Sequence, residues 1–260
     1  MAAYFPRGSR AFATTCCRRL QAAPAAPRRF WQSAGVGDSA GGHVVTLDGR
    51  PIKTPDGREV RVAAAQRGLA WLVAGEWEAP AEAPGAHALP LTSLVCRAID
   101  GLSDAQTHSD VIATLLRYFH TDSACLHDAS PRALVALQQT HYAPILAWAR
   151  AAYGIDIHVT ADLFALRQTP EAAEALRARL ALFSPLKLAA LEKATMAAKS
   201  LLIGLALVER RISAECAAQA AQVEADAQTQ RWGALENAHD IDNAALRQTL
   251  AASAVAAHRA

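Results

Sequence analysis

The chain has 260 residues, of which 52% are hydrophobic and 19% are charged. This length and composition suit one large or two small domains with a hydrophobic core. The formal net charge is +2, but the segment before Asp38 contains six arginines and no acidic residue. Without that segment the chain has 20 basic and 24 acidic residues, which gives a net charge of about −4. Such a mildly acidic body argues against a nucleic-acid partner, which would require a basic face.

Residues 1–37 have the composition of an organellar targeting segment. They are rich in Arg, Ala, Ser and Thr and lack the continuous apolar run of a secretory signal, which is typical of a mitochondrial transit peptide. A disordered tail without a targeting role is the alternative. We expect residues 1–37 to be removed on import into the matrix and to take no part in the fold. The most apolar window, Leu201–Val208, is far shorter than the roughly 20 residues of a membrane span, so we expect a soluble protein.

Residues 38–89 predict a small α+β domain that begins with a β-meander. Apolar positions alternate along His43–Val62, as in three short strands. Asp48-Gly49 is typical of a two-residue hairpin turn, because glycine adopts the positive φ that such turns need. Pro55-Asp56-Gly57 indicates a second turn.

A helix from about residue 63 to 78 should cover this meander. Its apolar positions recur at i, i+4 and i+8, on one face: Leu69, Val73 and Trp77. We therefore assign Trp77 a structural role between helix and sheet. The stretch from Glu78 to Pro90 is rich in proline and predicts a linker.

From residue 90 to 260 the pattern predicts a larger, all-helical domain. Two early helices carry complete apolar stripes: Leu91, Leu94, Val95, Ala98, Ile99 and Leu102, then Val111, Ile112, Leu115, Leu116 and Phe119. Ser109 is placed to cap the second of them. Pro131 suits the first turn of the next helix, and Pro144 should kink or split it.

The later elements are also helical, with one exception. Residues 155–160 indicate a short strand. Helices are then expected at about 170–183, 185–211 and 213–232, and from Asn243 to the end.

No nucleotide-binding or hydrolase motif is present in the sequence, since GxxxxGK[ST], GxGxxG, GxSxG and HExxH are all missing. Two acid–histidine clusters remain: His120, Asp122, His127 and Asp128, and then His239, Asp240 and Asp242. They permit the hypothesis of a helical metal-dependent phosphohydrolase. Helix capping explains Asp122, where a helix ends, and Asp242, just before the last helix, without a metal. Cys96, Cys125 and Cys216 are far apart and predict buried free thiols rather than a zinc site.

The helix before Trp232 carries the most informative residues. Its apolar stripe should comprise Cys216, Ala220, Val223 and Ala227. Glu224 lies at the edge of this stripe, where a solvated glutamate paired to Gln228 or Arg231 is the simplest interpretation. Trp232 is most simply a core anchor at the helix end, and Gly233 is then a left-handed cap.

The order of motifs along the chain resembles a known family. The matching stretches are VTLDGRPIKTPDGREVRV, LAWLVAGEWEA, LPLTSLVCRAIDGL, TLLRYFHTDSACL, APILAW, AKSLLIGLAL and EADAQTQRWGALENAHDID, from about His43 to Asp242. They are similar to the mitochondrial and alphaproteobacterial chaperones that assemble the F(1) head of ATP synthase, the F(1) complex assembly factor 2 family.

The resemblance implies a small α+β domain followed by a larger helical domain. It also implies a non-enzymatic monomer without cofactor or metal, which binds the free alpha subunit of F(1) and prevents its aggregation until the beta subunit replaces it. Acidic residues just before the Trp-Gly pair are implicated in the family's activity. This makes Glu224, with Asp226 as the alternative, a candidate client contact, together with Gln228 and Arg231. A generic binding module and the phosphohydrolase remain as alternatives.

Overall fold

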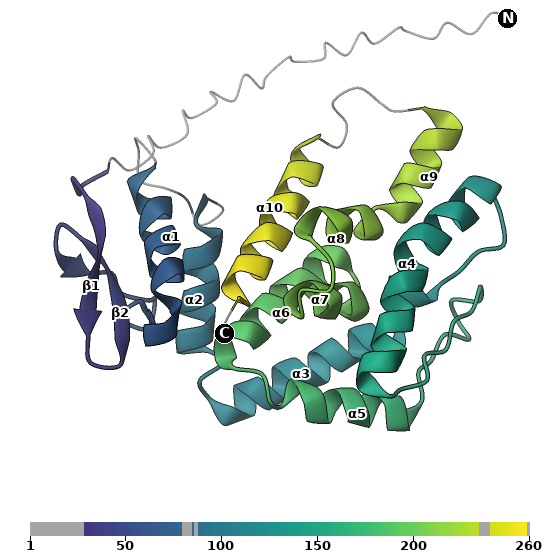
Figure 1. The fold of residues 1–260 in the computed structure, drawn as a ribbon, viewed down its shortest axis with the longest axis horizontal. Coiled ribbons are helices and arrows are strands. Elements are labelled where there is room, and N and C mark those ends of the chain that lie inside the picture. Colours follow the sequence, from purple (N-terminus) through teal and green to yellow (C-terminus); the bar gives the residue numbers. More distant parts are fainter. Residues whose placement is uncertain (1–28, 80–84, 86–87, 234–239, 259–260) are drawn as a thin grey trace, which may run out of the picture.

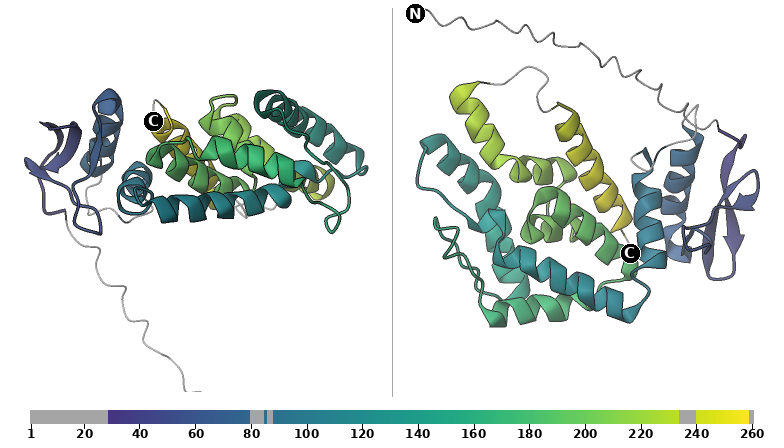
Figure 2. Two further views of the ribbon diagram at one scale, coloured as in Figure 1. Left: turned by 90° about the horizontal axis from the view of Figure 1, so that it is seen from below. Right: turned by 180° about the vertical axis from the view of Figure 1, so that it is seen from behind.

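A small antiparallel sheet lies at one end of the molecule and is followed by helices, as the α+β prediction requires (Figure 1). The computed structural model describes residues 29–79, 85, 88–233 and 240–258. The sheet marks one end of an elongated shape and helices α4 and α9 mark the other, both from the front (Figure 1) and from behind (Figure 2, right).

The sheet is built around its second strand. The strands are β1 (Ala34–Ser39), β2 (Gly42–Leu47), β3 (Arg50–Pro51) and β4 (Arg61–Ala63). β2 pairs antiparallel with each of the other three, and its Val45 lies opposite Val36 of β1. Asp48 and Gly49 both have positive φ, 48° and 78°, which confirms the predicted hairpin turn.

The exclusion of residues 1–37 from the fold is wrong for its last part. β1 begins at Ala34, and Trp31 is buried with only 4% of its surface exposed. Its ring centroid lies 5.3 Å from that of Trp77, in an edge-to-face contact. The arginine-rich composition hid this strand, because AGVGDS contains small residues and a single β-branched side chain.

Helix α1 (Arg67–Glu78) covers the sheet and also positions the next helix. Leu69 and Val73 are buried, as predicted, and Trp77 is half-buried. The Glu76 carboxylate accepts hydrogen bonds from the backbone N–H groups of Leu91 and Thr92, at 2.7 and 2.8 Å. This carboxylate therefore caps the start of α2 and joins the two ends of the predicted linker, most of which lies outside the described residues.

The remaining helices pack around a buried centre. They are α2 (Pro90–Asp100), α3 (Ala105–His120), α4 (Arg132–Tyr153), α5 (Pro170–Leu180), α6 (Pro185–Ala198), α7 (Leu201–Val208), α8 (Ala214–Ala221), α9 (Val223–Trp232) and α10 (Asp240–Ala256). Every residue of α7 is buried. The apolar core runs without a break from the sheet to α10, because α2 packs against both α1 and α6. None of the described helices combines the length and the apolar character that a bilayer crossing needs.

Two long predicted helices are each divided in the structure. The helix expected over 185–211 ends at α6, where Lys199 has a φ of 55°, and α7 begins after Ser200, which caps it. The helix expected over 213–232 breaks at Gln222, with φ −109° and ψ 6°, between α8 and α9. Neither break contains a proline or a glycine, and the apolar spacing of the sequence continues through both. The sequence pattern therefore indicated neither break.

Smaller differences concern helix ends. Asp104, not Ser109, caps α3, which begins four residues earlier than Ser109. Pro131 precedes α4 as its N-cap residue, and Pro144 does not split that helix. Residues 155–160 form no strand, since only Thr160 makes a bridge, to Leu126.

Candidate functional site

Helix α9 presents the predicted site residues on its open faces. Its buried residues, Val223 and Ala227, lie on the side that packs against α4. The four predicted contact residues are all exposed: Glu224, Asp226, Gln228 and Arg231. The prediction of a solvated glutamate at the edge of an apolar stripe agrees with this exposure, whereas Cys216, expected in the stripe, is exposed.

Trp232 is the main correction at this site. It was expected to anchor the core, but 70% of its surface is exposed. The Arg231 guanidinium lies 4.9 Å from the centre of its ring, a cation–π contact. The spacing of residues within α9 does not distinguish an anchor from an exposed side chain, because burial depends on contacts with other helices.

The cap after α9 is only partly as predicted. Gly233 has a positive φ of 85°, and its N–H donates to the carbonyl of Thr229 at 2.8 Å. Its ψ of 162° is extended, so the left-handed helical cap was wrong.

The two acids of α9 interact with different neighbours. Burial, and then the nearby Glu224 carboxylate, raise the pKa of Tyr142 on α4. The Asp226 charge instead acts on Arg247 of α10, whose pKa is raised by the Glu215 hydrogen bond and, more weakly, by Asp226. Glu224 and Asp226 therefore belong to two distinct faces of α9, and both favour the helix by lying near its N-terminus.

The first acid–histidine cluster is a structural turn. Asp122 is fully buried and accepts hydrogen bonds from the N–H groups of Ala124 and Leu202, each at 3.0 Å. His127 Nε2 contacts the carbonyl of Ala124 at 3.1 Å. These contacts confirm the capping interpretation of Asp122.

The second cluster is only partly described. His239 lies outside the described residues, whereas Asp240 and Asp242 lie in the first turn of α10 rather than before it. Carboxylates in that turn interact favourably with the helix dipole. Over residues 29–79, 88–233 and 240–258, no three His, Cys, Asp or Glu side chains are grouped so that they could hold a metal.

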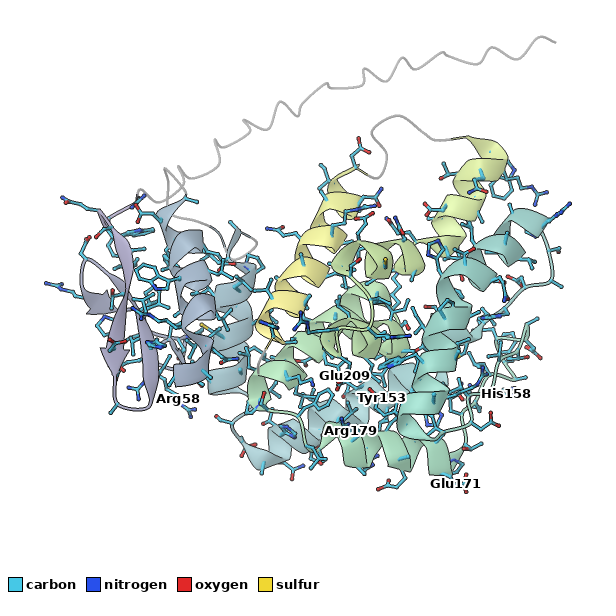
Figure 3. All side chains as sticks on the ribbon, viewed as in Figure 1. Arg58, Tyr153, His158, Glu171, Arg179 and Glu209 are labelled. Carbon is cyan, nitrogen blue, oxygen red and sulfur yellow. The ribbon has the colours of Figure 1, made fainter. Side chains whose placement is uncertain are left out.

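The other buried titratable groups also lack the features of a reactive site. Burial raises the pKa of the Cys96 thiol to about 11, and burial also raises the pKa of Cys125. Tyr153, at the end of α4, lies near Glu209 and Arg179 (Figure 3), and its burial raises its pKa. A raised pKa keeps thiols and phenols protonated at neutral pH, which is unsuited to nucleophilic chemistry.

Comparison with known proteins agrees with the fold and the motif order. Residues 28–150 match the family described as ATP12 chaperone protein. The protein atp12, mitochondrial, of Schizosaccharomyces pombe is 32% identical over 236 residues, which cover 88% of this chain and 81% of that protein. The protein ATP12, mitochondrial, of Saccharomyces cerevisiae is 29% identical over 273 residues, which cover 89% and 84%.

A solved structure is similar over the same extent. The crystal structure of Atp12 from Paracoccus denitrificans has a TM-score of 0.78 and 31% sequence identity, and the match covers 89% of this chain and 97% of that one. The chain therefore belongs to the ATP12 chaperone family, and it has the fold of that family.

Proposed function

We propose that this member of the ATP12 chaperone family assembles the F(1) sector of ATP synthase in the mitochondrial matrix. It binds the free alpha subunit and keeps it soluble until the beta subunit takes its place. It acts by binding alone and catalyses no reaction. Family membership and the mitochondrial relatives support the proposal.

The observation that carries the proposal is the exposed end of α9. Trp232 is a large aromatic side chain with 70% exposure, next to an arginine that stacks on it. Tryptophan and arginine are the residue types most enriched among those that dominate binding energy at protein interfaces. An exposed pair of this kind favours a protein partner over a small-molecule substrate.

The polar residues of α9 suit a contact that must later be released. A ring subunit without its neighbour exposes a large apolar interface, and such a surface aggregates unless it is covered. Glu224, Asp226 and Gln228 are exposed charged and polar side chains on the same helix, nearer its N-terminus than Trp232. A polar rim around an apolar contact gives specificity and fast association without making the complex permanent.

The targeting segment is proposed to end before Arg29. The Arg29 guanidinium donates to the carbonyls of Trp31 and Gln32 and to that of Glu78 on α1. Removal of residues beyond Arg29 would therefore remove contacts within the fold. N-terminal sequencing of the organellar protein tests this, and a mature chain that begins after Arg29 would contradict it.

The client is tested by co-expression with the alpha subunit of F(1) alone. We expect the chain to keep alpha in the soluble fraction and to co-purify with it, and addition of the beta subunit should release it. Trp232→Ala should lose this protection, whereas Phe164→Ala, which removes a 90% exposed aromatic elsewhere, should retain it. Equal aggregation of alpha with and without the wild-type chain would refute the proposal.

A further inference from the structure

A second surface lies far from α9, where the sheet-covering helix meets the end of the helical part. A groove with a volume of about 980 Å³ runs between α1, the connection from α7 to α8, and the end of α10. Its apolar lining comes from all three: Gly68, Leu69, Leu72, Leu207, Ile212 and Val255. We call it the α1–α10 groove. Leu72 is 51% exposed and Val255 is 38% exposed, so its walls are open to a partner.

The charged side chains along this groove are two arginines, and a histidine lies beside them. Arg210, Arg211 and His258 line it, and no acidic side chain does so among the described residues. Arg210 Nη1 lies 3.0 Å from Nδ1 of His258, so these two groups sit together at one end. Within the described part of the chain, neither Arg210 nor Arg211 forms an ion pair with an acid.

We propose that the α1–α10 groove binds an acidic, amphipathic segment of a partner protein. An apolar floor between helices accepts the apolar face of a helical or extended segment, and a basic rim pairs with carboxylates beside that face. The chain's own leader does not fit, because it carries six arginines and no acid before Asp38.

This surface is separate from the one proposed for the alpha subunit. The groove involves Ala254, Val255 and His258 at the C-terminal end of α10, whereas α9 is connected to the N-terminal end of α10. α10 has 17 residues and is therefore about 25 Å long. A segment in the groove would contact α1 and the C-terminal end of α10, whereas a client on α9 would lie beside α4, at the other end of the molecule (Figure 1).

Two glycines of α1 provide a matched test. A Cβ added to Gly68, which lines the groove, would meet nothing within 4 Å, and the same holds for Gly75, which lies two turns further along α1 and does not line the groove. Gly68→Phe should therefore fill the groove without disturbing the fold, and Gly75→Phe is the control. Both variants should keep or raise the thermal midpoint, because phenylalanine has a higher helix propensity than glycine.

The probe is a fluorescein-labelled helical peptide with leucines along one face and glutamates beside them. The control peptide carries lysines in place of the glutamates. We expect fluorescence anisotropy to show the glutamate peptide binding the wild-type chain at least about tenfold more tightly than the lysine peptide. Gly68→Phe should weaken that binding by about tenfold or more, and Gly75→Phe should leave it unchanged. Arg211→Glu should reverse the preference between the peptides.

Equal binding of both peptides, binding of neither, or an unchanged affinity in Gly68→Phe would overturn the proposal. If Gly68→Phe does not fold, Leu72→Asp tests the same wall through a side chain that is already half-exposed. A second copy of the chain is the other possible occupant of the groove, and sedimentation of the wild type and of Gly68→Phe tests for it. A wild-type dimer that Gly68→Phe disrupts would make the groove a self-association surface and would also overturn the proposal. The peptide assay contains no F(1) subunit, so its failure leaves the proposed function untouched.

Discussion

The Asp122 carboxylate accepts a hydrogen bond from the backbone N–H of Leu202 at 3.0 Å, across 80 residues of sequence. Its other oxygen accepts from the N–H of Ala124. Leu202 lies in the first turn of α7, where N–H groups have no partner within the helix. Asp122 therefore ties the turn after α3 to the start of the most buried helix in the described structure.

This buried carboxylate should give the stability of the protein a characteristic pH dependence. Burial raises the pKa of Asp122 to about 6 from an ordinary value of 3.8, although hydrogen bonds from Ser200 and Leu202 oppose the shift. The native state then holds the proton more tightly than the unfolded chain, so the free energy of unfolding falls as pH rises from about 4 to about 6. The loss from this group is at most about 3 kcal/mol.

Asp122→Asn isolates this effect, because the amide keeps the shape and does not titrate. Urea unfolding of both proteins at several pH values between 4 and 7 gives the difference in their free energies of unfolding. We expect the advantage of the wild type over Asp122→Asn to shrink as pH rises through this window. An advantage that is constant or grows with pH would show that the start of α7 stabilises the ionised carboxylate more than burial disfavours it.

Trp77→Arg should prevent stable folding. The Trp77 ring packs on Trp31, its Nε1 donates to Oγ1 of Thr92, and its carbonyl accepts from Nε1 of Trp31. Loss of the indole and partial burial of a cation should cost about 3–5 kcal/mol. Trp71→Arg is the control on the same helix, since Trp71 is 52% exposed. Thermal melting should show a large drop only for Trp77→Arg, and similar midpoints would contradict the structural role of Trp77.

Elements that depend on neighbouring residues could be predicted from the sequence. The Asp48-Gly49 turn needs only the φ values of those two residues. The stripes of α2 and α3 need only a repeated spacing, and their apolar residues are buried apart from a partly buried Ile99. The position of Glu224 at the edge of an apolar stripe also follows from spacing alone, which is why it was expected at the surface.

Features that depend on distant contacts could not be predicted. The break between α6 and α7 rests on Ser200 and on Asp122, which comes from the turn after α3. β1 becomes a strand because it pairs with β2, while its own sequence has low strand propensity. The exposure of Trp232 depends on whether another helix covers it, and the spacing of residues within α9 does not contain that information.

Two glycines should respond in opposite ways to the same substitution. A Cβ at Gly204 in α7 would lie 2.7 Å from Oγ1 of Thr195 on α6, so Gly204→Ala forces these helices apart. We expect a loss of about 1–3 kcal/mol from overpacking. Gly75→Ala meets open space and should gain about 0.5–1 kcal/mol through helix propensity. Urea unfolding checks both, and a loss at Gly75 or none at Gly204 would contradict the packing described.

The last prediction concerns the two acids of α9, which lie on different faces. Glu224→Lys should abolish protection of the alpha subunit, whereas Asp226→Lys should be nearly silent. Both side chains are exposed, so the direct cost to folding should stay within about 0.5 kcal/mol, with a further 0.3–1 kcal/mol because a cation opposes the helix dipole near an N-terminus. The dipole penalty applies to both variants, so the pair is matched for stability.

The measurement is light scattering of the unassembled alpha subunit with each variant, alongside circular dichroism of the variant alone. Glu224→Gln should be milder than Glu224→Lys, since it removes the charge but keeps the shape. If Asp226→Lys carries the defect and Glu224→Lys does not, the client contacts the side of α9 that faces Arg247 and α10, rather than the side that faces Tyr142 and α4. If both lysine variants protect fully, the charges of α9 are dispensable and the client must be held by other residues.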